Sequence, residues 1–187
     1  MSETPDRMRE RPASDDAIED ATAHYAAPRD SEGVRHGSVL VFRLGAEWLA
    51  FRTGALDRVA EPRPVHSLPK RRGGATAGLV NVGGDLVVHT SLAGLLGVEP
   101  LGAPPRNSAR KILARLLVLA DPRGRIAMTV DEVWGVHHYA LSSERPVPPT
   151  LARAPSSFTT AMLEVDGRAV GCLDSGRVMD ALSLAIS

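Results

Sequence analysis

The sequence predicts a mainly β fold in which two barrel-like lobes share one core. About ten short apolar, β-rich runs separated by glycine turns favour small barrels over a doubly wound sheet. A segment rich in proline and glycine, residues 98–111, divides these runs into two halves of similar pattern. Either half alone is too small to bury a stable core, so we expect the two lobes to share one.

The strand signals of the first half begin just after Ser38. Gly45-Ala46 and Gly83-Gly84 are turn dipeptides, and each joins two β-rich runs into a predicted hairpin. Ser91 is a good N-cap and Gly97 a good residue for a helix end, so we expect a short helix between them. The runs that we expect to be strands or extended segments are residues 39–42, 48–51, 54–59, 65–68, 78–82 and 85–89, of which 54–59 could instead be a helical turn.

The second half contains two further turn signals and one helical pattern. Residues 121–124 read Asp-Pro-Arg-Gly, and Asp166-Gly167 is a strong hairpin signal. Val178, Leu182 and Ala185 recur at helical spacing, which predicts a packed helix over residues 176–186. The strands that we expect in this half are residues 112–120, 125–130, 133–139, 159–165 and 169–173.

The charges of the chain are unevenly distributed, although their formal sum is zero. Residues 1–36 hold nine acidic residues and five arginines, with little apolar sequence, as is typical of a flexible segment. Residues 37–112 hold five acidic and ten basic residues, and residues 113–187 hold eight and seven. We therefore expect a flexible acidic arm, residues 1–36, before one domain, residues 37–186. The arm is either a solvated tail or a segment that touches the basic half or a partner.

Several classes of protein are disfavoured by composition. The 22 basic residues only balance the 22 acidic ones, whereas nucleic-acid binders usually show a basic excess. No apolar run approaches the roughly 18 residues that a membrane helix needs. The first 17 residues are polar and charged, unlike a signal peptide. We therefore expect a cytoplasmic protein that binds no nucleic acid and does not itself insert into a membrane.

No set of residues with catalytic or metal-binding spacing is evident. The adjacent His137 and His138 would point to opposite faces of a strand, so they could not easily share a metal ion. Cys172, the single cysteine, allows no internal disulfide and lies in an apolar hairpin typical of a buried thiol. Trp48 and Trp134 are better explained as core anchors than as a binding platform. A binding or scaffolding module without cofactor or metal is therefore favoured over an enzyme.

Three sequence blocks carry a resemblance to a known family. They are VLVFRLGAEWLAF at residues 39–51, GLVNVGGDLVVHTSLAGLLG at residues 78–97 and DEVWGV at residues 131–136, with VHSLP at residues 65–69 between the first two. In this order and spacing they resemble the CheW-like domain of bacterial chemosensory arrays, over roughly residues 37–186. The HSLP and SLxxLLG variants are most similar to the coupling proteins of Wsp-type surface-sensing systems.

The resemblance implies a fold, a role and partners. The fold would be two five-stranded SH3-like barrels that share a core, with short helices that include a C-terminal one. The role would be that of a non-enzymatic adaptor at the membrane-associated chemosensory array. It would bridge the cytoplasmic tip of a methyl-accepting chemoreceptor and a CheA-type histidine kinase. The alternative is a regulatory interaction domain that binds the kinase or the receptor without coupling them fully.

The resemblance also indicates where partners would bind. A receptor tip is a helical hairpin, so docking would follow the helix-in-groove mode with apolar anchors. Leu56 and Val59 match such positions, with Val80 and Val82 nearby. Each of the four could instead be an ordinary core residue, and for Val80 and Val82 the core is the favoured interpretation.

The sequence departs from the usual family pattern at Arg58, at Gly83 and at the pair Thr90-Ser91. Arg58 stands where many members have glutamate, and Gly83 stands where many have arginine in an N-x-R-G turn, so a salt link or partner contact is lost or reversed there. Thr90-Ser91 also replaces the commoner Val-Asp before Leu92. The predicted partner-binding residues are Leu56, Arg58, Val59, Val80, Asn81, Val82, Gly83 and Gly84.

Overall fold

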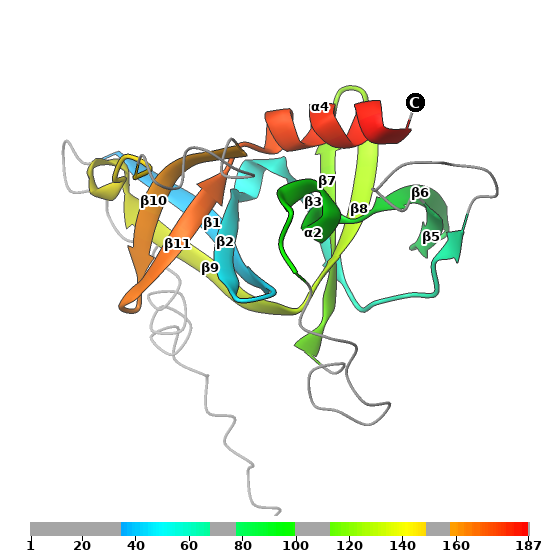
Figure 1. Cartoon of the computed structure of the whole chain (residues 1–187), viewed down its shortest axis with the longest axis horizontal. Coiled ribbons are helices and arrows are strands. Elements are labelled where there is room, and N and C mark those ends of the chain that lie inside the picture. The colour runs from blue at the N-terminus through cyan, green and yellow to red at the C-terminus, as the bar shows by residue number, and fades with distance from the viewer. Residues whose placement is uncertain (1–34, 68–77, 100–112, 149–157, 187) are drawn as a thin grey trace, which may run out of the picture. The chain divides into compact units, whose positions relative to one another are not determined.

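The computed structural model describes residues 35–67, 78–99, 113–148 and 158–186, and these ranges form two β-sheets with a few short helices (Figure 1). No helix within these ranges is long and apolar enough to cross a membrane. Most of the segment rich in proline and glycine, residues 98–111, and residues 1–34 of the predicted arm lie outside the described residues. The elements in chain order are β1 (His36–Leu44), β2 (Glu47–Arg52), η2 (Thr53–Ala55), β3 (Leu56–Ala60), β4 (His66–Ser67), β5 (Gly78–Val82), β6 (Asp85–Thr90), α2 (Leu92–Leu96), β7 (Arg115–Asp121), β8 (Gly124–Val130), β9 (Glu132–Ala140), η3 (Leu141–Ser143), β10 (Thr159–Val165), β11 (Arg168–Leu173) and α4 (Ser175–Ile186).

The five-stranded sheet brings together the first and the last strands of the described chain. Its strand order is β10-β11-β2-β1-β9. The predicted hairpin of β1 and β2 is present, with Phe42 opposite Leu49. Strand β11 pairs in parallel with β2, where Cys172 lies opposite Ala50. The N-terminal hairpin is therefore the centre of a sheet whose outer strands come from the second half of the sequence.

The six-stranded sheet is also built from both halves of the chain. Its order is β3-β7-β8-β6-β5-β4, and a parallel pairing of β6 with β8 joins the two halves. The expectation that each lobe corresponds to one half of the sequence is therefore wrong. Local strand patterns look alike in both halves because every half-buried strand needs the same alternation, whichever strand it pairs with. The basic stretch, residues 37–112, consequently contributes to both sheets.

Buried residues from both sheets and from the helices α2 and α4 form one central core, as expected from the sequence. The rings of Phe42 and Phe51 stack there with centroids 5.4 Å apart. Two smaller groups of buried side chains fill the interior on either side, one against each sheet. The central core consists of Leu40, Phe42, Leu44, Leu49, Phe51, Leu92, Leu96, Leu117, Leu119, Ile126, Met128, Val130, Leu173, Val178, Met179 and Leu182.

Several local predictions are confirmed by hydrogen bonds and dihedral angles. The Ser91 hydroxyl accepts a hydrogen bond from the Gly94 N–H (3.0 Å), and Gly97 ends α2 in the left-handed conformation. Residues 54–59 include both predicted forms, since the turn η2 leads directly into β3. The predicted strand at residues 112–120 begins later, because β7 starts at Arg115.

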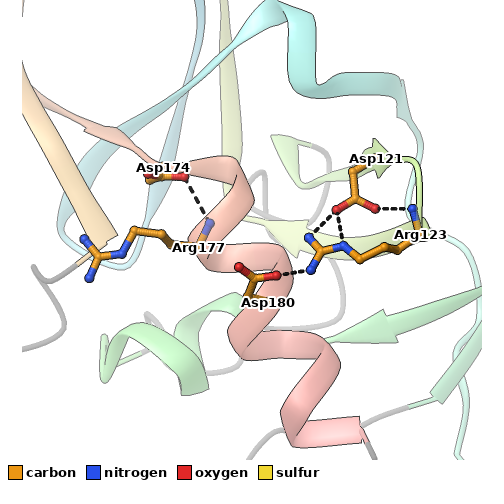
Figure 2. A network of polar contacts seen from close by, with 5 residues as sticks. All are labelled: Asp121, Arg123, Asp174, Arg177 and Asp180. Atoms are coloured by element: carbon orange, nitrogen blue, oxygen red, sulfur yellow. Dashed lines mark hydrogen bonds and ion pairs between the residues drawn. The ribbon is translucent and has the colours of Figure 1, made fainter.

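The C-terminal helix α4 is attached to the turn between β7 and β8 (Figure 2). Asp174 caps the helix, since its Oδ1 accepts from the backbone N–H of Arg177 (3.0 Å). From the turn, Arg123 forms ion pairs with Asp121 and with Asp180 on the helix. Buried Val178 anchors the other side of the helix in the central core. The predicted helix over residues 176–186 is confirmed and begins one residue earlier.

Candidate functional site

The predicted partner-binding residues lie on β3 and on the β5–β6 hairpin, both in the six-stranded sheet. Their exposure separates them into two groups. Val80 and Val82 are buried in one of the two smaller interior groups, whereas 41% of Val59 is exposed. Leu56 is partly buried and packs against the central core. Of the four apolar positions, only Val59 therefore has the exposure expected of an anchor for a partner.

Arg58 reaches from β3 to the turn between β5 and β6. A Cβ atom at Gly83 would collide with the Arg58 Nη1 and would lie 3.5 Å from its Cζ. Gly83 also has a positive φ of 65°, a conformation that suits glycine in a two-residue hairpin turn. The Asn81 side chain supports this turn, because its Oδ1 accepts from the Gly84 N–H (2.9 Å). The two family departures at Arg58 and Gly83 are therefore in direct contact.

The carboxylates close to this contact are bound to another arginine. Arg125, at the start of β8, forms an ion pair with Asp85 (2.8 Å) and a longer one with Asp57 (3.7 Å). The hydrogen bond and charge of Arg125 lower the pKa of Asp85, and the charge of Arg58 contributes less. Among the described residues, no carboxylate comes within salt-bridge distance of Arg58. Its guanidinium therefore keeps donors that a partner could use.

One exposed apolar residue of this region was not singled out from the sequence. Leu86 lies opposite Asn81 in the β5–β6 register, and 67% of it is exposed. Leu86, Val87 and Val88 form a continuous apolar run, so the sequence carries no alternation that would show which of them faces outward. We call the exposed residues Arg58, Val59, Asn81, Gly83, Gly84 and Leu86 the β3/β5–β6 surface.

A second cluster of aromatic and charged side chains lies on the five-stranded sheet. Trp48 on β2 and Trp134 on β9 are half-buried, with ring centroids 5.0 Å apart. The Arg168 guanidinium lies over both rings, 4.8 Å and 4.6 Å from their centroids. Both indoles pack against the buried group that includes Val39 and Val41, which agrees with their expected role as core anchors.

Cys172, His89 and His137 have the environments of structural residues. Cys172 is buried, and burial raises the pKa of its thiol. The His89 Nε2 lies 2.9 Å from the Thr129 hydroxyl, and burial lowers the pKa of His89. His137 packs edge-on against Trp134, while the adjacent His138 is exposed. Within the described ranges, no three metal-ligating side chains converge.

Comparisons with known proteins agree with this fold. The sequence matches the family model of the CheW-like domain over residues 38–183. Among solved structures, it is similar to the scaffolding protein TtCheW from Thermoanaerobacter tengcongensis, with a TM-score of 0.62 and 17% sequence identity. The match covers 77% of this chain and 88% of that one, and at this identity it supports the fold alone. No curated protein matches the sequence.

Proposed function

We propose, from the premise that this chain belongs to the CheW-like domain family, that it couples a methyl-accepting chemoreceptor to a CheA-type histidine kinase. The family consists of non-enzymatic adaptors of chemotaxis signalling. The observation that carries the proposal is the extent of the family match, which runs from β1 into α4. The proposed place of action is the cytoplasmic face of a membrane-associated chemosensory array.

The β3/β5–β6 surface is the proposed docking site for the receptor tip. Helix-in-groove recognition needs an exposed apolar anchor held on a rigid support. Val59 provides such an anchor, and Leu86 adds apolar area. Behind them, Val80 and Val82 fill the interior and position the hairpin, so their role in binding would be indirect.

Coupling also requires a separate surface for the kinase. The family's kinase contacts use barrel-end loops and edge strands, and the outer strands of the five-stranded sheet, β9 and β10, are candidates here. A second surface on the other sheet would leave the β3/β5–β6 surface free. Both partners could then bind at once, as a coupling protein requires.

A co-sedimentation assay with receptor-containing membranes and purified kinase from the same organism tests the proposal. We expect the wild-type protein to sediment with the membranes and to increase the amount of kinase that sediments. Val59→Asp should weaken sedimentation without changing the circular-dichroism spectrum, because Val59 is exposed. An exposed residue on the other sheet supplies the control, Val136→Asp, which should leave receptor binding unchanged. Wild-type protein that binds neither partner would refute the proposal.

The contact between Arg58 and Gly83 favours a second candidate, a regulatory domain that binds one partner without full coupling. Restoring the commoner residues, in the double variant Arg58→Glu with Gly83→Arg, would place opposite charges at two touching positions. Arginine at Gly83 would also have to adopt a positive φ, so the folding of the variant must be checked. A gain in kinase activation would support this candidate, whereas no gain would show that these positions do not limit coupling.

The Wsp-type subgroup remains a proposal that a genomic observation can test. Systems of this kind control a second messenger rather than motility. A gene for a diguanylate-cyclase response regulator beside this one would support the assignment. Flagellar motor genes and a motility-type response regulator in its place would contradict it.

A further inference from the structure

We propose that Asp131 is a positioning residue for coupling, because its carboxylate ties the start of β9 to the turn between β1 and β2. The contact would set where β9 lies relative to the six-stranded sheet. This inference rests on the proposed function, in which the two partner surfaces lie on different sheets. The evidence is the place of Asp131 between two strands, its hydrogen bonds and the tight packing of the turn that it binds.

Asp131 is the single residue that links β8 to β9. Strand β8 ends at Val130 in the six-stranded sheet, and β9 begins at Glu132 in the five-stranded sheet. A link of one residue has one pair of soft backbone dihedrals with which to change direction, so the path of β9 follows closely from that of β8. Because β9 is the outer strand of its sheet, its first residues depend strongly on the contacts made at this link.

Both the side chain and the backbone of Asp131 bind the β1–β2 hairpin. Its Oδ2 accepts a hydrogen bond from the Gly45 N–H (2.6 Å), and its own N–H donates to the Arg43 carbonyl (3.0 Å). The Arg43 guanidinium in turn pairs with Glu132, the first residue of β9 (3.0 Å). A charged acceptor makes a stronger hydrogen bond than a neutral one. These three contacts hold the link between the sheets against the end of the hairpin.

The turn that Asp131 binds is also held from its other side. Gly45 has a φ of 59°, and a Cβ atom there would lie 2.6 Å from the backbone oxygen of Glu99 and 2.7 Å from the Val98 Cγ1. A backbone carbonyl cannot swing aside as the end of a side chain can, so this position requires glycine. Residues 98–99 follow α2, which comes directly after β6. The turn therefore lies between two segments that leave the six-stranded sheet, one after β6 and one after β8.

The central core holds the residues on either side of the link. Val130 is buried in that core, and the half-buried Val133 packs against it. Loss of the Asp131 carboxylate should therefore leave the fold intact and release mainly the turn and the start of β9. The proposed kinase surface includes β9, whereas the proposed receptor surface lies on the six-stranded sheet. We expect Asp131 to matter when both partners are bound together, and to matter little for either partner alone.

Five variants test this inference. Asp131→Ala removes the acceptor, Asp131→Asn keeps an acceptor oxygen without the charge, and Gly45→Ala forces the turn away from the neighbouring carbonyl. Asp174→Ala is the matched control for Asp131→Ala, because the Asp174 carboxylate also accepts from a backbone N–H, at the start of α4 (3.0 Å). Gly167→Ala is the control for Gly45→Ala, since Gly167 has a φ of 74° and a Cβ there would meet nothing within 4 Å. Circular dichroism establishes that each variant is folded.

Two measurements on the protein alone report on the contact. Loss of a hydrogen bond to a charged group should speed hydrogen exchange of the Gly45 amide about tenfold or more in Asp131→Ala. Spin labels on Val136→Cys in β9 and Leu86→Cys in β6 report the distance between the sheets, while the buried Cys172 stays unlabelled. The distance distribution should broaden in Asp131→Ala and Gly45→Ala. It should stay close to that of the wild type in Asp131→Asn and in both controls.

The functional measurement separates binding from coupling, in protein without labels. Binding of the receptor fragment and of the kinase is measured for each partner alone, and kinase stimulation is measured with all three components. Asp131→Ala should bind each partner alone like the wild type. Its stimulation of the kinase should fall about fivefold or more, because engagement of two sites at once depends on the geometry between them. Asp131→Asn should restore most of the stimulation, and Asp174→Ala should keep it.

The outcomes distinguish this inference from the proposed function. Unchanged Gly45 exchange and label distances in Asp131→Ala would overturn the contact as a positioning device. Broader distances with full kinase stimulation would overturn its role in coupling and leave the adaptor role intact. An equal loss of stimulation in Asp174→Ala would also overturn it, since lower stability would then explain the effect. Wild-type protein that binds neither partner would refute the adaptor role, and with it the role of Asp131 in coupling, whatever the label distances show.

Discussion

Replacing Thr90 by valine should stabilise the protein. Thr90 ends β6 and is completely buried, and its hydroxyl has no hydrogen-bond partner among the described residues. Burying a hydroxyl without a partner costs about 1–3 kcal/mol in proteins. Valine has nearly the same shape and suits a strand equally well. Thr90→Val removes the unpaired hydroxyl without leaving a cavity, so we expect a gain of about 1–2 kcal/mol in the free energy of unfolding.

The gain can be measured by urea titration at neutral pH and by thermal unfolding. For a protein of this size, 1 kcal/mol corresponds to roughly 2–4 °C in Tm, so we expect a rise of about 2–8 °C. Thr160→Val is the matched control, because Thr160 is exposed and its hydroxyl donates to the Cys172 carbonyl (3.2 Å). That variant loses a bond and should be neutral or slightly less stable. A Thr90→Val protein less stable than the wild type would show that the hydroxyl is satisfied, for example by a bound water molecule, and would refute the reasoning.

Three further predictions concern stability and reactivity. Leu56→Asp should lower the free energy of unfolding by more than about 2 kcal/mol in urea titrations, because it puts a charge against the central core, whereas the exposed Val59→Asp should change it little. Burial lowers the pKa of His89 in the folded protein below its ordinary value near 6.5. The stability that the neutral imidazole contributes is therefore complete above pH 6.5. It is lost as the pH falls toward the folded-state pKa, because the unfolded chain takes up the proton first. The difference in urea midpoint between pH 7.5 and pH 5.5 should therefore shrink in His89→Gln, and an unchanged difference would contradict this assignment. Cys172 should react with a thiol reagent only after denaturation, because its thiol is buried and its pKa is raised, and rapid labelling of the native protein would contradict the structure.

Local signals in the sequence predicted the individual elements well because each depends on a few adjacent residues. The Ser91 cap, the Gly97 helix end and the hairpin across Gly83-Gly84 all follow from side chains and dihedral preferences at those positions. The pairing of strands did not follow, since the parallel contacts of β2 with β11 and of β6 with β8 join residues far apart in the sequence. Alternation shows which face of a strand is buried, but not which strand lies beside it.

The candidate site was predictable in part for the same reason. The resemblance to a family indicated Arg58 and Gly83 as separate departures, and their contact became visible only in the structure. The ion pairs of Arg125 with Asp57 and Asp85 link three different strands, so no local pattern could have revealed them. Leu86 was missed because it lies within an apolar run, where no alternation distinguishes the outward-facing residue from the buried ones.

The interleaving of the two sheets bears directly on the proposed adaptor role. The chain passes from β2 in one sheet to β3 in the other through η2 alone, and the core that holds the Phe42 and Phe51 rings includes residues of both sheets. Side chains in such a core are close-packed, so one sheet cannot shift far without disturbing the other. Two lobes made from successive halves of the chain could have moved about their connector, and the angle between two bound partners would then vary. A core that both sheets share instead fixes the β3/β5–β6 surface relative to the outer strands β9 and β10, and a scaffold that holds a receptor and a kinase in one geometry needs that property.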